Sequence, residues 1–318
     1  MRAWQFTETH APLVLNDVPE PVAAPGEVLI DIRAAGLCHS DVGLMEDEGW
    51  LTMLGKRPIT IGHEIAGVVA ALGEGVDRWK IGDRIGVCPT SMTSPGYRRD
   101  GGYTFKATAR QDDIVRIPDT VSFELGAIGT DAGMTSYHAV MVTGGVKAGD
   151  KVGIIGFGGL GQIGARVAVL AGAQVYVAEI NEAVWPLAES AGVEAVARDV
   201  REFAGLGLDV IIDFAGFDTT TAAAVDIIRR GGTVVVVGMG LLSSTISTKS
   251  LILNQCRLLG SGGGTVDDIA GVYRLYESGD LMPVVSTIDF EAIPAGLERL
   301  RAGAVTGRLV AVIAAPQT

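Results

Sequence analysis

Cysteine is scarce in this chain of 318 residues, which contains three: Cys38, Cys88 and Cys256. An odd and sparse set provides no disulfide framework, so we expect a reducing compartment and a cytoplasmic protein. The N-terminal residues lack the apolar core of a secretory signal. Glycine interrupts the longest apolar stretches well short of the about 18 residues that a membrane-spanning helix needs, so we expect no membrane partner.

Basic residues are also few. The chain has 25 Lys and Arg against 37 Asp and Glu, which gives a net charge of −12. An acidic surface repels phosphates, so the composition argues against a nucleic-acid partner. Hydrophobic residues make up 48% of the chain and charged residues 19%, enough to bury a large core and to exclude disorder.

The chain changes its pattern twice. Residues 1–120 contain short apolar runs of β type separated by glycine turns, and residues 122–143 have a helical pattern. From Lys151 onward, apolar strands alternate with helices, which predicts a doubly wound parallel sheet. The tail, residues 284–318, returns to β-type runs. We therefore expect an α/β protein of two domains.

The expected domain boundaries follow from this pattern. The tail is expected to fold back onto the β-rich first part, which makes that domain discontinuous. We expect it to contain residues 1–132 and 265–318, and the domain with the parallel sheet to contain residues 133–264.

A glycine signature opens the parallel part. It lies between an expected strand, Val152–Ile155, and an expected helix, Gln162–Ala171. In such a turn the first glycine permits a tight bend, the second admits a pyrophosphate, and the third lets helix and strand pack closely. The alternative is a chance glycine turn. The six residues are Gly156, Phe157, Gly158, Gly159, Leu160 and Gly161.

Glu179 stands eighteen residues after the signature, at the expected end of the next strand. A carboxylate there accepts hydrogen bonds from the adenosine ribose hydroxyls and repels a 2′-phosphate, which predicts NAD rather than NADP. The alternative is an ordinary solvated strand end.

Two short polar segments contain residues suited to a metal site. The first is Gly36-Leu-Cys38-His39-Ser40-Asp41, and the second is Gly62-His63-Glu64. A cysteine thiolate and an imidazole are preferred zinc ligands, and Ser40 could handle a proton beside them. The alternative is that Cys38 and His63 are buried core residues without a metal.

These segments are followed by Gly82-Asp83-Arg84-Ile85, Gly101-Gly102-Tyr103 and the glycine signature. In this order, over nearly the whole chain, the motifs resemble the zinc-dependent alcohol dehydrogenases of the medium-chain dehydrogenase/reductase superfamily. The resemblance implies a GroES-like β-rich catalytic domain and a Rossmann coenzyme domain, with the active site in the cleft between them.

The resemblance also implies a third zinc ligand just before the coenzyme domain. That ligand is commonly cysteine, and Asp131 stands in its place here. A carboxylate oxygen is an acceptable zinc ligand, although Asp131 could instead cap the helix that begins near Ala132. In the family, Glu64 lies behind the zinc and can approach it, and Asp41 orients the ligand histidine. Both could also be simple salt-bridge acids.

Ser40 matches the hydroxyl residue that hydrogen-bonds the substrate oxygen. A relay histidine found in some members would fall at Gly43, so the proton must leave through a ribose hydroxyl, water or His39. By resemblance, the coenzyme pyrophosphate contacts His39 and Arg308, and the nicotinamide contacts Thr135. By the same resemblance the pocket wall contains Trp50, Pro89 and Met239, each of which could equally be ordinary core packing. Cys88 is also expected in the wall, the alternative being a metal ligand. Met239 is also expected beside the coenzyme.

Most full-length relatives carry a second zinc in a lobe with four closely spaced cysteines. The matching segment of this chain, from Gly86 to Gly101, contains one cysteine, Cys88. The resemblance therefore predicts a shortened lobe, one catalytic zinc per subunit and no structural zinc.

We expect a zinc-dependent enzyme that reversibly transfers hydride between a hydrophobic primary or secondary alcohol and NAD, giving an aldehyde or ketone. Two alternatives remain: a zinc-independent quinone or enoyl reductase of the same superfamily, and a non-catalytic dinucleotide-binding protein. The expected partners are a small alcohol or carbonyl substrate and further copies of the chain, as a homodimer or homotetramer.

Overall fold

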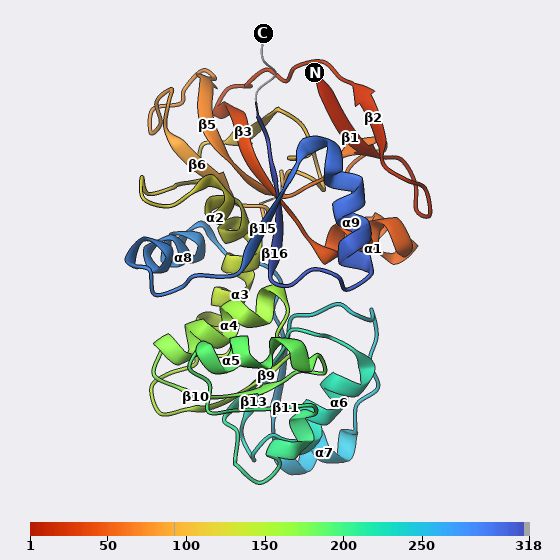
Figure 1. Cartoon of the computed structure of the whole chain (residues 1–318), viewed down its shortest axis with the longest axis vertical. Coiled ribbons are helices and arrows are strands. Elements are labelled where there is room, and N and C mark those ends of the chain that lie inside the picture. Colours follow the sequence, from red (N-terminus) through yellow and green to blue (C-terminus); the bar gives the residue numbers. More distant parts are fainter. Residues whose placement is uncertain (92, 315–318) are drawn as a thin grey trace. The chain divides into compact units, whose positions relative to one another are not determined.

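The computed structural model describes residues 1–91 and 93–314. The chain divides into two compact units (Figure 1). The first unit contains Met1–Ala132 and the segment that starts at Thr265, and the second contains Gly133–Gly264. Among the described residues, no helix has both the length and the apolar character needed to cross a membrane.

A seven-stranded sheet forms the centre of the first unit, and its longest strand is β3 (Glu27–Leu37). Side chains alternate between partly exposed and buried positions from residue 27 to residue 34, as expected for a strand with one face on the core, and the last four residues of β3 are all buried. β3 pairs with β5 (Glu64–Leu72), β7 (Lys106–Arg110) and β16 (Arg308–Val312). The remaining strands of the first unit are β1 (Arg2–Phe6), β2 (Val14–Asp17), β4 (Ile59–Thr60), β6 (Arg84–Val87), β8 (Ile114–Arg116) and β15 (Val285–Asp289).

The C-terminal tail completes this sheet. In Figure 1 its blue strands lie beside the red and orange strands from the start of the chain, and Leu309 pairs with Leu37 in the antiparallel ladder of β16 and β3. The tail also contains a helix, α9 (Ile293–Arg301), that the sequence analysis missed. α9 is amphipathic and buries Ile293, Leu297 and Leu300 at helical spacing.

The expectation of strands and turns for residues 1–120 was incomplete as well, because α1 (His39–Glu46) and the 3₁₀ segment Glu48–Met53 follow β3. α1 begins directly after Cys38. Its N-terminus is closed by Asp41, whose carboxylate accepts a hydrogen bond from the Cys38 backbone N–H at 3.1 Å. The cap therefore fixes the residues that the sequence assigned to chemistry.

The helical pattern at 122–143 corresponds to α2 (Phe123–Ile128), a π-helical turn at Gly129–Gly133, α3 (Met134–His138) and a second π-helical segment, Ala139–Thr143. Ser122 caps the start of α2 by accepting a hydrogen bond from the Leu125 N–H. Single π-helical turns inside helices frequently mark functional sites, and this first one contains Asp131.

The second unit is built on a six-stranded sheet in the order β11-β10-β9-β12-β13-β14, with every neighbouring pair parallel. The chain runs outward from β9 on one side and returns to β12 on the other, so the doubly wound sheet is confirmed and its switch point lies between these strands. The strands are β9 (Lys151–Ile155), β10 (Gln174–Ala178), β11 (Ala195–Ala197), β12 (Val210–Asp213), β13 (Thr233–Val236) and β14 (Arg257–Gly260).

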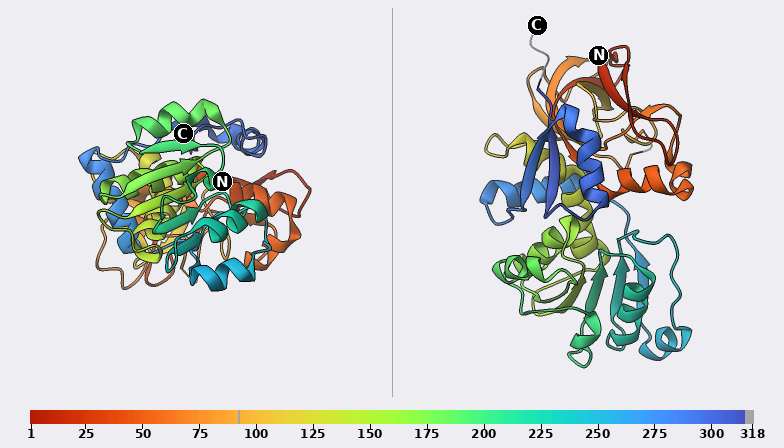
Figure 2. Two further views of the ribbon diagram at one scale, coloured as in Figure 1. Left: turned by 90° about the horizontal axis from the view of Figure 1, so that it is seen from below. Right: turned by 45° about the vertical axis from the view of Figure 1, so that its right-hand side comes forward.

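Helices connect these strands, and Figure 2 shows them packed against the sheet. α4 contacts β9 and β10, and α6 contacts β12 and β13. The sequence analysis placed α4 within a few residues but missed the short edge strand β11. The helices after the π-helical segments are α4 (Gly159–Leu170), α5 (Trp185–Ser190), α6 (Asp218–Ile227), α7 (Thr248–Asn254) and, in the first unit, α8 (Val266–Ser278).

Candidate metal centre and coenzyme site

Four side chains of the first unit gather at one point. Cys38, His63, Glu64 and Asp131 each offer a ligand atom, and these atoms all lie within 4.8 Å of one another. They come from the start of α1, the start of β5 and the π-helical turn after α2. The fold thus brings together the three residues that the sequence proposed as zinc ligands, with Glu64 beside them.

The geometry within this cluster suits a zinc ion. Asp131 Oδ2 lies 3.2 Å from His63 Nε2 and 3.7 Å from Cys38 Sγ. Sulfur, imidazole nitrogen and carboxylate oxygen are the donor types that zinc accepts, and three protein ligands leave a position open for chemistry. The carboxylate of Asp131 points at the other two donors from inside a helical turn, which argues against a mere capping role.

Asp41 holds the histidine from the other side. Its Oδ2 accepts hydrogen bonds from the Cys38 N–H and from the Tyr103 hydroxyl at 2.7 Å, and its Oδ1 lies 3.5 Å from His63 Nδ1. Among the described residues, neither that oxygen nor that nitrogen has a hydrogen-bond partner. Asp41 is therefore placed to orient the imidazole so that Nε2 faces the cluster.

The cluster also binds a proton well. Burial alone lowers the pKa of His63, but its polar neighbours, including Asp41 and Asp131, raise that pKa well above its ordinary value. A proton and a metal ion therefore compete for this imidazole.

Glu64 is fully buried and forms an ion pair with Arg308 of β16. Arg308 also donates a hydrogen bond to the Leu37 carbonyl at 3.1 Å. Burial raises the pKa of Glu64 and the guanidinium opposes that rise. A Cβ at Gly36 would lie 1.8 Å from Glu64 Oε2, so only glycine fits there. The expected contact of Arg308 with the coenzyme stays a prediction.

Ser40 accepts a hydrogen bond from the Tyr97 hydroxyl at 2.9 Å. The Tyr97 ring stacks on His63, with 4.9 Å between ring centroids and 29° between planes. Burial raises the pKa of Tyr97 well above its ordinary value, so the hydroxyl is a neutral donor. The sequence analysis missed Tyr97, because no spacing pattern links it to Ser40 or His63.

Gly43 is covered by Trp50. A Cβ at Gly43 would lie 2.7 Å from Cε2 of the indole, so the space that a relay histidine would need is filled.

Cys88 and Pro89 are buried, and burial raises the pKa of the Cys88 thiol, which keeps it neutral. That Trp50, Cys88 and Pro89 form the wall of a substrate pocket stays a prediction.

The glycine turn in the second unit has the three properties expected of it. Gly156 has a φ of +85°, which favours glycine. A Cβ at Gly158 would meet nothing within 4 Å, whereas a Cβ at Gly161 would lie 1.9 Å from the Gly156 carbonyl oxygen. The turn is thus tight, open where a phosphate would approach, and closely packed against its helix.

Glu179 follows β10 and reaches this turn. Its carboxylate accepts hydrogen bonds from the Phe157 N–H at 2.6 Å and the Asn181 N–H at 2.7 Å.

Met239 lines a cavity of about 330 Å³ together with Gly216 and Gly238, beyond the carboxyl ends of β12 and β13. Thr135 is buried in α3 and His39 is exposed at the start of α1; their coenzyme contacts stay predictions.

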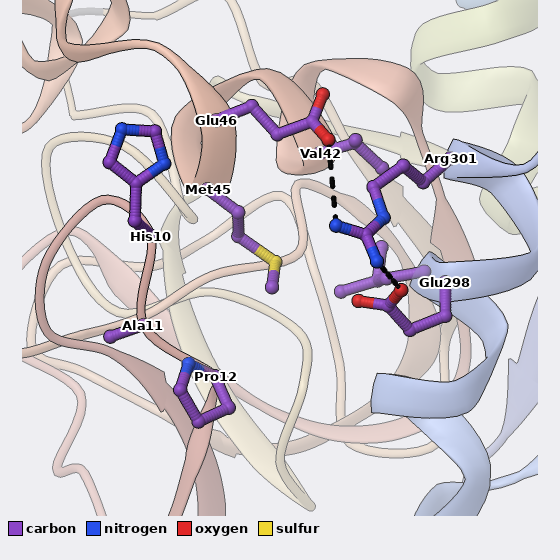
Figure 3. Close-up of a pocket in the computed structure, with 9 residues that line it drawn as sticks. His10, Ala11, Pro12, Val42, Met45, Glu46, Glu298 and Arg301 are labelled. Atoms are coloured by element: carbon purple, nitrogen blue, oxygen red, sulfur yellow. Dashed lines mark hydrogen bonds and ion pairs between the residues drawn. The ribbon is translucent and has the colours of Figure 1, made fainter.

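A larger cavity, of about 580 Å³, lies in the first unit between α1 and α9 (Figure 3). Arg301 projects into it and pairs with Glu46 at 3.8 Å and with Glu298. Its lining includes none of the residues proposed for metal, coenzyme or substrate, so we place the chemistry at the Cys38–His63–Asp131 cluster. The lining consists of His10, Ala11, Pro12, Val42, Met45, Glu46, Leu297, Glu298 and Arg301.

Comparisons with known proteins agree with both units. Residues 24–119 match the family model described as the alcohol dehydrogenase GroES-like domain, and residues 159–278 match the one described as zinc-binding dehydrogenase. An alcohol dehydrogenase of Geobacillus stearothermophilus is 31% identical over 98% of this chain and 99% of its own length.

Solved structures show the same likeness. Acetophenone reductase from Geotrichum candidum, in complex with NAD, superposes with a TM-score of 0.90 at 30% identity, covering 98% of this chain and 97% of that one. The alcohol dehydrogenase of the archaeon Aeropyrum pernix gives a TM-score of 0.89 at 28% identity, covering 98% and 100%. With both units, the ligand cluster and the glycine turn in place, this chain belongs to the zinc-type alcohol dehydrogenases of the medium-chain dehydrogenase/reductase superfamily.

Proposed function

We propose that this protein is an NAD-dependent alcohol dehydrogenase or carbonyl reductase that holds one catalytic zinc ion through Cys38, His63 and Asp131 and has no structural zinc. The observation that carries the proposal is the convergence of sulfur, nitrogen and oxygen donors within 4.8 Å. We assign metal binding to a domain of residues 1–132 and 265–318, and coenzyme binding to residues 133–264.

Zinc and NAD, when bound, supply a Lewis acid for the substrate oxygen and an acceptor for hydride. The residues of the chain then orient and move a proton. Asp41 holds the imidazole of His63, and the buried Glu64–Arg308 pair stands beside the ligands. Ser40 hydrogen-bonds the substrate oxygen and transfers its proton during oxidation.

The substrate in this proposal is a hydrophobic alcohol or its ketone. Trp50 and Pro89 are apolar, and they are close in sequence to Ser40 and to Cys88. The relative from Geotrichum candidum is named for acetophenone, a hydrophobic ketone, which supports this substrate class.

The absence of a structural zinc is supported by the cysteine count. The chain has three cysteines, of which Cys38 is assigned to the catalytic ion. Cys88 and Cys256 cannot make a four-cysteine site. None of the three cysteines forms a disulfide, which also supports a reducing, cytoplasmic compartment.

We further propose that the chain forms a homodimer through the edge of its six-stranded sheet. A homotetramer would consist of two such dimers and would need a second contact surface. β14 is an edge strand, and neighbouring apolar side chains are exposed, including Ile252 and Leu253 of α7 and Leu259 of β14. Light scattering of Leu253→Glu, with Glu194→Gln at the opposite side of the sheet as control, tests this: the first variant should be monomeric.

Metal analysis combined with a substrate panel tests the function. We expect one zinc per chain and reversible NADH formation from secondary and primary hydrophobic alcohols. Removal of zinc by a chelator should abolish activity, and adding zinc should restore it. Full activity in a zinc-free sample would identify a zinc-independent reductase instead, and coenzyme binding without turnover of any alcohol, quinone or enone would identify a non-catalytic protein.

A further inference from the structure

Tyr97 is held in a segment that fits closely against the start of β5. A Cβ at Gly96 would lie 2.9 Å from the Gly62 carbonyl oxygen, and a Cβ at Gly101 would lie 2.3 Å from the same atom. The Tyr97 carbonyl accepts a hydrogen bond from the Gly55 N–H at 2.8 Å. Two glycines that permit this approach, and a backbone hydrogen bond, thus fix Tyr97 beside His63.

Ion pairs of Arg99 and Asp100 also hold the other end of this segment in place. Arg99 forms two hydrogen bonds with the Glu27 carboxylate, at 2.7 and 3.2 Å, and a further one with the Thr108 hydroxyl at 2.5 Å. Asp100 accepts hydrogen bonds from the Lys56 ammonium and the Thr60 N–H. Bidentate pairs of this kind restrict orientation as well as position.

From this position Tyr97 makes two contacts with different functions. Its ring lies on the imidazole of His63, at 4.9 Å between centroids, and its hydroxyl donates to Ser40 Oγ at 2.9 Å. The side chain is 8% exposed, so water competes little for the hydroxyl.

The direction of the hydrogen bond matters. Because Tyr97 donates, it occupies a lone pair of Ser40 Oγ and leaves the serine O–H available for another acceptor. Residue 43 itself cannot supply a competing partner, since Trp50 fills the space that a side chain at Gly43 would need. The hydroxyl of Ser40 is therefore oriented by Tyr97.

We propose that Tyr97 is a positioning residue for the alcohol–carbonyl reaction: its hydroxyl directs the Ser40 O–H toward the substrate oxygen, and its ring keeps the imidazole of His63 facing the metal ligands. The role toward the substrate rests on the proposed function. The hydrogen bond and the stacking contact do not depend on it.

A double-mutant cycle on kinetics tests the hydroxyl. Tyr97→Phe keeps the ring and removes the O–H, so kcat should fall roughly 3–10-fold with KM within about twofold, the range for one net hydrogen bond acting in the transition state. In the Ser40→Ala background the same change should cause no further fall in kcat. An equal fall in both backgrounds, or none in the parent, would overturn the proposal.

A second cycle needs no activity. In the metal-free protein, Tyr97→Phe should raise the unfolding equilibrium constant about 2–10-fold when Ser40 is present and less when it is alanine. Additive effects would show that the two hydroxyls are uncoupled. If the parent oxidises no alcohol, the proposed function fails, and this cycle still decides whether Tyr97 positions Ser40.

Zinc affinity, measured by competition with a chromogenic chelator, tests the ring. Tyr97→Phe should bind zinc like the parent, whereas Tyr97→Ala should bind it at least fivefold more weakly. Equal affinity in the alanine variant would overturn the role of the ring.

The matched control for the unfolding cycle is Tyr273→Phe, which removes a buried hydroxyl that donates to the Gly126 carbonyl at 2.8 Å. Its effect on unfolding should be the same with Ser40 and with alanine at that position.

Discussion

Asp131 Oδ2 lies 3.2 Å from His63 Nε2, although 68 positions separate the two residues in the chain. The contact joins a π-helical turn after α2 to the start of β5. It places a carboxylate where the family commonly has a thiolate, with the same formal charge but a harder donor atom.

The first prediction concerns this carboxylate. Asp131→Ala should weaken zinc binding by more than the about 10–100-fold that loss of an outer partner typically causes, because we propose Asp131 as a direct ligand. Asp131→Cys should retain zinc, since a thiolate restores charge and ligand number. Zinc content after dialysis against a chelator measures both, and an alanine variant that retains parental zinc would remove Asp131 from the ligand set.

Asp41 should act through His63. Asp41→Asn keeps the shape but removes the charge beside Nδ1, so zinc affinity should fall about 10–100-fold. The control is Asp119→Asn, which makes the same change at an exposed position of the first unit and should leave affinity unchanged. Equal affinities in the two variants would contradict an orienting role for Asp41.

Two glycines of the coenzyme turn should respond differently to the same change. Gly158→Ala adds a methyl group in open space, so thermal stability should be near that of the parent while NAD binding weakens at least tenfold. Gly161→Ala places its methyl group 1.9 Å from the Gly156 carbonyl oxygen, so the unfolding temperature itself should fall. Calorimetry and NADH fluorescence titration separate the effects; a stable Gly161→Ala protein would argue against close packing.

Glu179 should determine the coenzyme preference. Glu179→Gln removes a charged hydrogen-bond acceptor for the ribose, worth about 1.5–3 kcal/mol, so kcat/KM for NAD should fall roughly 10–100-fold and that for NADP should rise. The matched control is Glu182→Gln. Glu182 lies three residues later and forms an exposed ion pair with Arg198. Steady-state assays with both coenzymes provide the readout, and an unchanged NAD/NADP ratio would contradict the assignment.

A pH effect on stability is expected at Asp83, away from the metal ligands. Arg116 binds its carboxylate in a bidentate pair at 2.9 Å and lowers the pKa of Asp83. A carboxyl whose pKa is depressed by folding stabilises the protein above its unfolded pKa of about 3.9, and loses this effect as pH falls through the folded value.

At pH 7, Asp83→Asn should therefore cost about 1 kcal/mol of unfolding free energy, reduced by the exposure of Arg116 to solvent. The cost should shrink as the pH is lowered below about 4. Urea unfolding at several pH values measures it. The exposed pair of Asp112 and Arg78 provides a control, since Asp112→Asn should change little at any pH. A cost for Asp83→Asn that does not vary with pH would rule out this linkage.

Strand–turn–helix spacing is a local signal, so the sequence indicated the doubly wound sheet. The grouping of Cys38, His63 and Asp131 came instead from the resemblance to a known family. α9 was also readable in principle from the spacing of Ile293, Leu297 and Leu300. The hydrogen bond from Tyr97 to Ser40 was not, because it spans 57 positions and depends on how a loop without a regular pattern packs.

The ion pair of Glu64 with Arg308 spans 244 positions, with the whole second unit between them in the chain. Synthesis runs from the N-terminus, so Cys38, His63 and Asp131 leave the ribosome long before the cation that neutralises Glu64. Burying that carboxylate alone would be costly. The second unit is continuous in the chain, whereas the sheet of the first unit is complete only once β16 has been synthesised.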